Sequence, residues 1–171
     1  MNVSSPEKIL SQAEAICLQR NVRLTPQRLE VLRLMSQHHG AISAYDLLDL
    51  LRNSEPQAKP PTVYRALDFL LEQGFVHRVE STNSYVVCHH FEQPSHASAM
   101  LICDRCGAVA EQHAEGVENI LKSLALNTGF ALATSVIEAH GLCKKCVAVE
   151  ACQHRDVCQH DHTVTAKRRG R

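Results

Sequence analysis

Residues 60–74 have the sequence PPTVYRALDFLLEQG, and this stretch is the clearest guide to the architecture of the first half of the chain. Two prolines at its start and a glycine at its end predict a helix, because proline fits the first helical turn and glycine fits the left-handed position after the last. Apolar side chains at helical spacing predict the buried face, which consists of Val63, Leu67, Leu70 and Leu71. The complementary face carries Thr62, Tyr64, Arg65 and Asp68.

Three further helices are predicted before this stretch, each from a capping signal. Ser4 and Glu7 have the spacing of a capping box, and Thr25 is followed by a proline that suits a first turn. Ser43 is predicted to cap a third helix that runs to about Asn53. The inward-facing residues of the first two helices are predicted to be Ile9, Ala13, Ile16, Cys17, Val31, Leu32 and Met35.

After residue 74 the spacing of apolar residues changes to two. Residues 75–80 and 84–89 alternate in this way and flank residues 81–83, which predicts a β-hairpin. Compact helices followed by a hairpin occur in this order in winged helix-turn-helix domains, so we expect residues 61–73 to be a recognition helix. A small α+β domain that binds nothing is the alternative at this point.

The second half has the pattern of a separate α/β domain. Residues 99–103, 108–111 and 130–139 are predicted strands, and residues 117–127 a predicted amphipathic helix. The expected fold class is therefore α+β, with a winged-helix domain over residues 1–90, a hinge over 91–98, a smaller α/β dimerisation and metal-binding domain over 99–150, and a Cys/His-containing basic tail over 151–171.

Hydropathy and the distribution of charge argue against a membrane-spanning or secreted protein, while the net charge gives no indication of a partner. The 18 Lys and Arg residues equal the 18 Asp and Glu residues, and each side of the boundary after Glu80 has nine of each kind, so the bulk charge does not indicate a nucleic-acid partner. No apolar run reaches the roughly 18 residues that a membrane helix needs. Charged residues interrupt the first 21 residues, which argues against a secretory signal and predicts a cytoplasmic protein.

Cysteine spacing is the strongest chemical signal in the chain. Two CxxC pairs present four thiolates that suit a tetrahedral zinc ion, namely Cys103, Cys106, Cys143 and Cys146. A reducing compartment favours metal binding over a disulfide framework. Since four thiolates close the coordination shell, the pattern predicts a structural rather than a catalytic site.

A second candidate metal group follows from the predicted hairpin. If its turn is centred on residues 82–83, His77 lies directly opposite Cys88 on one face, with side chains about 5 Å apart. His96 in the following loop and Glu111 at the end of a later strand could complete a set of four ligands, and the thiolate favours zinc over iron(II) or manganese(II). The alternative for each residue alone is a surface histidine or a core cysteine.

Three other interpretations apply to cysteine and histidine residues of this chain. His113-x-Glu115 upstream of a CxxC pair is typical of zinc deaminases, but Leu142 replaces the expected proline and Cys103-x-x-Cys106 is left without a purpose. Thiol redox chemistry is a further alternative for the CxxC pairs. A third metal site could form in the C-terminal segment from Cys152, His154, Cys158, His160 and His162.

Several motifs together resemble the ferric-uptake-regulator family of metal-dependent repressors. They are Leu24-Thr25-Pro26-Gln27-Arg28, Pro61-Thr62-Val63-Tyr64-Arg65-Ala66-Leu67 and the two CxxC pairs, and the resemblance covers about residues 5–150. It implies an N-terminal winged helix, a C-terminal α/β dimerisation domain and a cytoplasmic homodimer. Iron and peroxide sensors of this family have an H-x-H run before the first CxxC pair, where this chain has Ala97-Ser98-Ala99-Met100.

That departure makes the chain more similar to the zinc-sensing branch of the family. The resemblance then implies two zinc ions per chain, a structural ion at the four cysteines and a regulatory ion at His77, Cys88, His96 and Glu111. It implies a repressor of zinc-uptake genes that binds double-stranded operator DNA with zinc as corepressor, and neither an enzyme nor a protein with a membrane or a small organic substrate as its partner. An iron- or peroxide-responsive repressor is the alternative within the family.

The first turns of the recognition helix are the part expected to reach bases, through Thr62, Tyr64 and Arg65. Arg65 could bind guanine with two hydrogen bonds. Tyr45 is expected to touch a thymine methyl or a phosphate, with partial burial as its alternative. Arg23 and Arg28 are predicted phosphate contacts.

Overall fold

The computed structural model describes residues 5–90, 98–133 and 135–150. The chain divides into two compact units, Met1–Ser95 and His96–Arg171. None of the helices among the described residues is long and apolar enough to cross a membrane. Each unit has its own three-stranded sheet.

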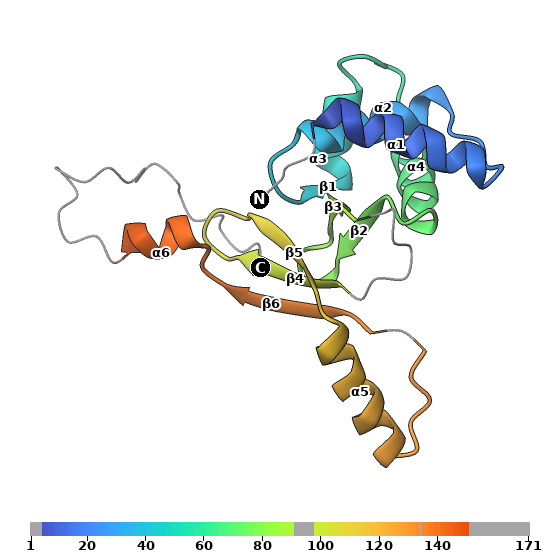
Figure 1. Cartoon of the computed structure of the whole chain (residues 1–171). Coiled ribbons are helices and arrows are strands. Elements are labelled where there is room, and N and C mark those ends of the chain that lie inside the picture. The colour runs from blue at the N-terminus through green and yellow to red at the C-terminus, as the bar shows by residue number, and fades with distance from the viewer. Residues whose placement is uncertain (1–4, 91–97, 134, 151–171) are drawn as a thin grey trace. The chain divides into compact units, whose positions relative to one another are not determined.

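Four helices form most of the first unit (Figure 1): α1 (Pro6–Gln19), α2 (Pro26–Gln37), α3 (Ala44–Leu51) and α4 (Pro60–Glu72). Hydroxyl caps begin three of them, because the side chains of Ser5, Thr25 and Ser43 accept backbone N–H groups three residues later at 3.4, 3.4 and 3.1 Å. The predicted start of α1 was one residue early, since its cap is Ser5, followed by a proline in the first turn. The third helix ends two residues before the predicted Asn53.

The core of this unit joins all four helices to the small sheet. Its fully buried members include Val31, Leu32, Leu47, Leu51, Val63, Leu67 and Leu70. The predicted buried face of α4 is confirmed except that Leu71 is only partly buried, and Phe69 is a buried residue that the pattern did not identify. Gly74 follows α4 with φ +75°, as expected for a left-handed residue after the last turn.

The sheet of the first unit has three strands: β1 (Ile42–Ser43), β2 (Val76–Val79) and β3 (Ser84–Val87), in the order β1-β3-β2. Strand β1 was not predicted, because a two-residue strand leaves no periodic signal. Its pairing with β3 ties the Ser43 cap of α3 to the hairpin.

The predicted register of the hairpin is wrong by two residues. His77 pairs with Val86, while the Cys88 N–H donates to the Phe75 carbonyl at 2.9 Å. The cause is the turn, in which a short 3-10 helix (Glu80–Thr82) is followed by Asn83 with φ 47°, so four residues rather than two connect the strands. A shift of two residues leaves every side chain on its expected face.

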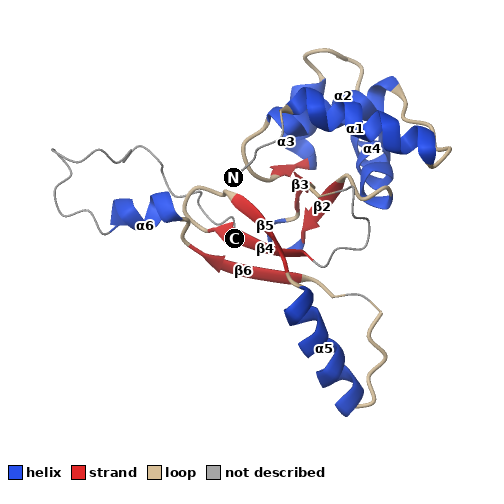
Figure 2. Ribbon diagram, in the orientation of Figure 1, coloured by secondary structure: helices blue, strands red, loops and turns tan. Residues whose placement is uncertain are grey.

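The second unit contains β4 (Ser98–Cys103), β5 (Val109–His113), α5 (Glu115–Asn127), β6 (Ile137–Gly141) and α6 (Lys144–Glu150). Its sheet has the order β5-β4-β6, with β5 antiparallel and β6 parallel to β4 (Figure 2). The strand predicted over residues 130–139 is β6, which begins at Ile137 and ends at Gly141, and these residues pair with Ala99 to Cys103 of β4. Helix α6 was not predicted.

Candidate metal centres and nucleic-acid interface

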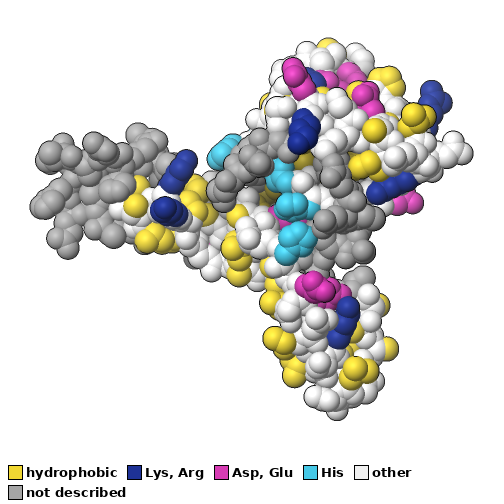
Figure 3. Space-filling model, viewed as in Figure 1, with side chains coloured by type: hydrophobic (Ala, Val, Ile, Leu, Met, Phe, Trp, Pro, Cys, Tyr) yellow, Lys and Arg dark blue, Asp and Glu magenta, His cyan; other side chains and the backbone are white. Residues whose placement is uncertain are grey.

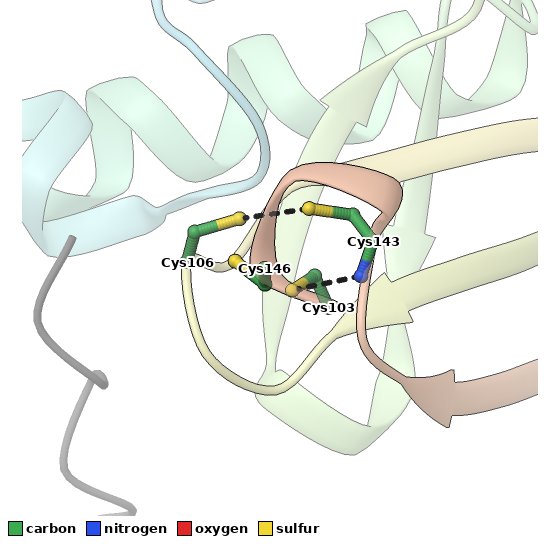
Figure 4. Close-up of side chains that lie close together, drawn as sticks. All are labelled: Cys103, Cys106, Cys143 and Cys146. Carbon is green, nitrogen blue, oxygen red and sulfur yellow. Dashed lines mark hydrogen bonds between the residues drawn. The ribbon is translucent and has the colours of Figure 1, made fainter. Parts of the chain in front are cut away.

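The four CxxC cysteines meet at one edge of the second sheet. Cys103 is the last residue of β4, and its parallel neighbour β6 ends at the paired residue Gly141, two positions before Cys143. Cys106 lies in the turn after β4, and Cys146 lies in α6 (Figure 4). Parallel strands bring their carboxyl ends to the same edge, so this topology converts the distant pairs into one cluster.

The distances within this cluster fit a zinc ion. All four sulfurs lie within 4.8 Å of one another, and the sulfurs of Cys106 and Cys143 are 3.7 Å apart. A tetrahedron with zinc–sulfur bonds of about 2.3 Å has sulfur–sulfur edges of about 3.8 Å. The donors are four thiol groups, two buried and two half-buried, and they would leave no coordination position open.

Backbone donors favour a thiolate in this cluster. Burial raises the pKa of the Cys103 thiol, but hydrogen bonds from the N–H groups of Cys106, Cys143 and Arg105 outweigh it and bring the pKa to about 6. Burial raises the pKa of Cys106, and it raises that of Cys146 to about 12. Such a set of buried thiols requires a cation to ionise fully, which is the contribution a zinc ion makes when bound.

His77 and Cys88 form a second pair of metal-ligating side chains within the first unit. A ring nitrogen of His77 and the sulfur of Cys88 lie within 4.8 Å of each other, even though the two residues are diagonal rather than directly opposed. Cys88 is buried, and its sulfur accepts the His90 N–H at 3.3 Å.

The other two predicted ligands are not residues of the hairpin. Glu111 is a half-buried residue of β5, opposite Met100, and its carboxylate accepts the Ser98 hydroxyl at 2.6 Å. His96 lies outside the described residues. The same holds for the residues of the possible third metal site, which are Cys152, His154, Cys158, His160 and His162.

The deaminase interpretation finds no support in the geometry. Cys103 and Cys106 belong to the same cluster as Cys143 and Cys146, so the four thiols already satisfy one tetrahedral ion. His113 is an exposed residue at the end of β5 and belongs to none of the metal-ligating groups within residues 5–90, 98–133 and 135–150. The three-ligand catalytic set is therefore not formed by the described residues.

The residues predicted to read DNA lie mostly at the surface of the first unit. Tyr45 is 69% exposed and Tyr64 is 39% exposed, so the alternative of partial burial does not apply to Tyr45. Arg65 is exposed as well. Thr62 is half-buried and its hydroxyl accepts the Lys59 N–H at 3.4 Å, which gives it a second role as part of the α4 cap.

The two predicted phosphate contacts differ in environment. Arg23 is exposed, whereas Arg28 is half-buried and lies over the ring of Phe69, with 3.8 Å between its guanidinium carbon and the ring centroid. This contact was not predicted from the sequence. Phe69 lies next to the predicted buried stripe of α4, and an aromatic side chain at that position is the one sequence signal of a cation–π contact.

Comparisons with known proteins agree with this arrangement. The model of the ferric uptake regulator family matches residues 19–140. The chain is 71% identical to the zinc uptake regulation protein of Escherichia coli (strain K12), over 100% of both chains, and 28% identical to the peroxide operon regulator of Bacillus subtilis (strain 168), over 80% of this chain and 92% of that one.

Two solved structures are similar as well. The first is a zinc uptake regulator complexed with zinc and DNA, at 75% identity and a TM-score of 0.85, over 87% of this chain and 99% of that one. The second is holo XcZur, at 44% identity and a TM-score of 0.76, over 81% and 96% of the two chains.

Proposed function

The chain belongs to the ferric uptake regulator family, and we propose that it represses zinc-uptake genes by binding operator DNA when zinc is plentiful. It is a transcription regulator and not an enzyme. The observation that carries this function is the combination of a closed cluster of four cysteines with a His77–Cys88 pair in the first unit, in a chain similar over its full length to a zinc uptake regulation protein.

The four-cysteine cluster would hold a structural zinc ion. The unfolded chain has no such cluster, because the two pairs are separated by 36 residues, so binding would contribute directly to the folding of the second unit. Cys103, Cys106, Cys143 and Cys146 would serve only as ligands, since their closed shell leaves no position for a substrate.

A regulatory zinc ion would be held by His77, Cys88, His96 and Glu111. The His77–Cys88 pair is already assembled within the first unit, and one thiolate with two imidazoles and one carboxylate is a donor set that favours zinc. Ser98 lies ten residues after Cys88, and its hydroxyl holds the Glu111 carboxylate. A connection this short keeps Glu111 at a high effective concentration near the pair.

These four ligands would make DNA binding dependent on zinc. His77 and Cys88 belong to the wing, and Glu111 belongs to the second unit, so all four can satisfy one ion only in a restricted set of arrangements of the two units. In a dimer, that restriction would set the spacing of two recognition helices, which must meet successive major grooves about 34–36 Å apart. Without zinc, only a fraction of the dimers would have the arrangement that binds operator DNA. The apparent affinity for the operator would fall in proportion to that fraction.

Exposed residues would make the DNA contacts. Arg65, Tyr64 and Thr62 lie in the first two turns of α4, which is the part of a recognition helix that meets base edges. Tyr45 lies in the first turn of α3, where its exposed ring suits a thymine methyl or a phosphate. Arg23 would contact a phosphate from the loop before α2.

A homodimer would form through α5. This helix has no fully buried residue, and its apolar stripe includes Val117, Ile120 and Leu124, which are 45%, 61% and 57% exposed. Hydrophobic side chains are visible along its surface (Figure 3). A stripe of this kind on one helix indicates an interface, and a second copy of the chain supplies an identical stripe to cover it.

An iron- or peroxide-responsive repressor is not proposed. The positions of the family's H-x-H run hold Ala97-Ser98-Ala99-Met100, and the last three of these lie in β4 without an imidazole among them. Alanine and methionine lack the nitrogen and oxygen ligands that iron(II) prefers, and the Ser98 hydroxyl donates a hydrogen bond to Glu111.

The test combines a metal count with DNA selection. Purified protein would be analysed for zinc by mass spectrometry before and after mild chelation, and duplexes would be selected from a random pool at buffered free zinc. We expect two ions per chain of unequal lability, and one selected sequence that binds only when the labile ion is present. Selection of the same duplex by fully chelated protein would contradict the proposal, and so would selection dependent on iron(II) but not on zinc.

A further inference from the structure

Arg28 lies against the recognition helix rather than away from the protein. Its guanidinium carbon is 3.8 Å from the centroid of the Phe69 ring, which is within the range of a cation–π contact. Phe69 belongs to α4 and is 8% exposed, while Arg28 belongs to α2 and is half-buried. The contact therefore joins two helices at the edge of the core.

A second contact fixes the same guanidinium group. Its Nη1 donates a hydrogen bond to the Arg23 carbonyl at 2.7 Å, which fastens the loop before α2. The charge of this group also affects a buried thiol. Burial raises the pKa of Cys17, and the positive charges of Arg20 and Arg28 partly oppose that rise. Arg28 is thus held on two sides, by the Phe69 ring of α4 and by the Arg23 carbonyl.

This contact lies one helical turn from the residue expected to read DNA. Phe69 follows Arg65 by four positions on α4, which is about 6 Å along a helix. A second cation fixes the end of the same helix, because Arg20 donates to the Gln73 carbonyl at 2.6 Å. Both arginines lie close to the α1–α2 connection, and both hold the C-terminal half of α4.

We propose that Arg28 is a positioning residue for operator recognition, which acts through Phe69 to fix the orientation of α4, and that it is not a phosphate contact. The inference rests on the proposed function, since it requires that α4 reads an operator. It replaces the role that the sequence pattern suggested for Arg28. Arg23, whose side chain is exposed, keeps its predicted phosphate contact.

The two roles for Arg28 predict opposite behaviour in three measurements. A phosphate contact supports binding to every sequence, so its loss weakens operator and random DNA alike and lowers the slope of log K against log salt by about 0.9 per contact. A lysine largely replaces such a contact, because it keeps the charge. A positioning residue affects the operator only, leaves the salt slope unchanged, and is not replaced by lysine, which lacks the planar group that stacks on a ring.

The experiment compares four variants with the wild-type protein. They are Arg28→Ala, Arg28→Lys, Phe69→Leu and the double variant Arg28→Lys/Phe69→Leu, with Arg33→Ala as a control that removes one positive charge elsewhere on α2. The probes are the duplex selected by the zinc-loaded wild-type protein and a random duplex of equal length, each titrated at several salt concentrations. Circular dichroism and zinc content establish that each variant is folded and loaded.

We expect Arg28→Ala, Arg28→Lys and Phe69→Leu each to bind the selected duplex about tenfold more weakly, which is about 1.4 kcal/mol. Random-duplex affinity and the salt slope should match the wild type. The double variant should be no weaker than either of its single variants, because both remove the same contact. Arg33→Ala should keep the wild-type preference for the selected duplex.

Two results would overturn the inference. One is wild-type operator affinity in Arg28→Lys, and the other is equal weakening on both duplexes in Arg28→Ala, Arg28→Lys or Phe69→Leu. Failure of the wild-type protein to select any duplex at buffered zinc would instead contradict the proposed function, so the two failures are distinguishable.

Discussion

The backbone N–H of Cys143 donates a hydrogen bond to the sulfur of Cys103 at 3.3 Å and so links residues 40 positions apart in the chain. The second CxxC pair therefore stabilises a thiolate of the first pair, and both pairs would bind the same ion. Such N–H donors are the groups that orient metal-binding sulfurs and lower the pKa of their thiols.

Replacing Cys103 should disrupt the second unit. Cys103→Ser removes one of four ligands, and loss of a structural zinc should cost much of the roughly 5–15 kcal/mol by which small proteins are stable. We expect loss of zinc and dispersal of the dimer, measured by mass spectrometry and sedimentation. Cys17→Ser is the control, because Cys17 is a buried cysteine of the first unit and belongs to neither metal-ligating group among the described residues. A dimeric Cys103→Ser protein with wild-type melting temperature would contradict the structural role.

Arg65 should carry base specificity. Arg65→Ala removes a side chain suited to two hydrogen bonds with guanine, so we expect operator affinity to fall by about 1–3 kcal/mol while random-DNA affinity changes far less. Arg65→Lys keeps the charge but not the paired geometry, and it should lose a similar amount. Fluorescence anisotropy with the selected duplex and its single-base variants measures both effects. An unchanged ratio of operator to random affinity would remove Arg65 from the reading residues.

Replacing Cys88 should remove the response to zinc without unfolding the protein. Cys88→Ser should keep the four-cysteine zinc and the dimer, because those depend on the second unit, but should lose zinc-dependent operator binding. His89→Ala alters the neighbouring exposed histidine and should respond to zinc like the wild type. Operator binding is titrated against buffered free zinc for all three proteins. If Cys88→Ser keeps the wild-type response, the regulatory ion binds elsewhere, and the C-terminal set that begins with Cys152 becomes the next candidate.

Glu30 should make the first unit sensitive to acid. Its carboxylate is hydrogen-bonded by Arg33 at 2.7 Å, and this bond lowers the pKa of Glu30 below its ordinary value of 4.5, although burial acts in the opposite direction. A lowered pKa adds stability that is complete above the ordinary value and is lost as the pH falls through the folded-state pKa. The Glu30→Gln variant should therefore melt at a lower temperature than the wild type at neutral pH. Its melting temperature should also fall less than that of the wild type when the pH is lowered.

Tyrosine fluorescence measures this effect in the first unit alone, because Tyr45, Tyr64 and Tyr85 are the three tyrosines of the chain. Glu14→Gln, at an exposed position of α1, serves as the control and should follow the wild-type curve. If the melting temperatures of Glu30→Gln and the wild type fall by the same amount between neutral pH and about pH 3, Glu30 is not the source of the acid sensitivity.

Helix α5 should control assembly. Ile120→Glu places a charge in the middle of the exposed apolar stripe, where burial against a second copy would leave that charge unpaired. We expect the variant to sediment as a monomer and to keep its structural zinc. Asn119→Glu adds the same charge on the opposite side of the helix and should remain dimeric. Dimers of both variants with equal dissociation constants would show that α5 is not the interface.

Local signals predicted the helices of the first unit well, because caps such as Thr25 and Ser43 are properties of a few adjacent residues. The hairpin register was missed, since it depends on the left-handed conformation of Asn83, which the sequence allows but does not require. The limits of β6 were missed as well, because they are set by its partner β4.

In the candidate sites, too, features set by local sequence were predicted and features set by distant contacts were not. Spacing alone identified the four-cysteine cluster, and the alternation of the hairpin identified the His77–Cys88 pair in spite of the wrong register, because a two-residue error does not change faces. The contact between Arg28 and Phe69 was missed, since no short pattern relates residues that are 41 positions apart. Contacts of this range follow only from the packing of α2 on α4.

The parallel pairing of β4 with β6 places Cys103 beside Gly141 and thereby fixes where the second cysteine pair begins. The described residues between α5 and β6 have no part in that pairing. Its length is therefore independent of the metal geometry, and a few added or deleted residues there should cost only the small entropy of a longer or shorter loop. One added residue between Gly141 and Cys143 would instead displace a sulfur. Tolerance to insertion in this unit is thus decided by strand register, and it changes abruptly at Ile137, where pairing with β4 begins.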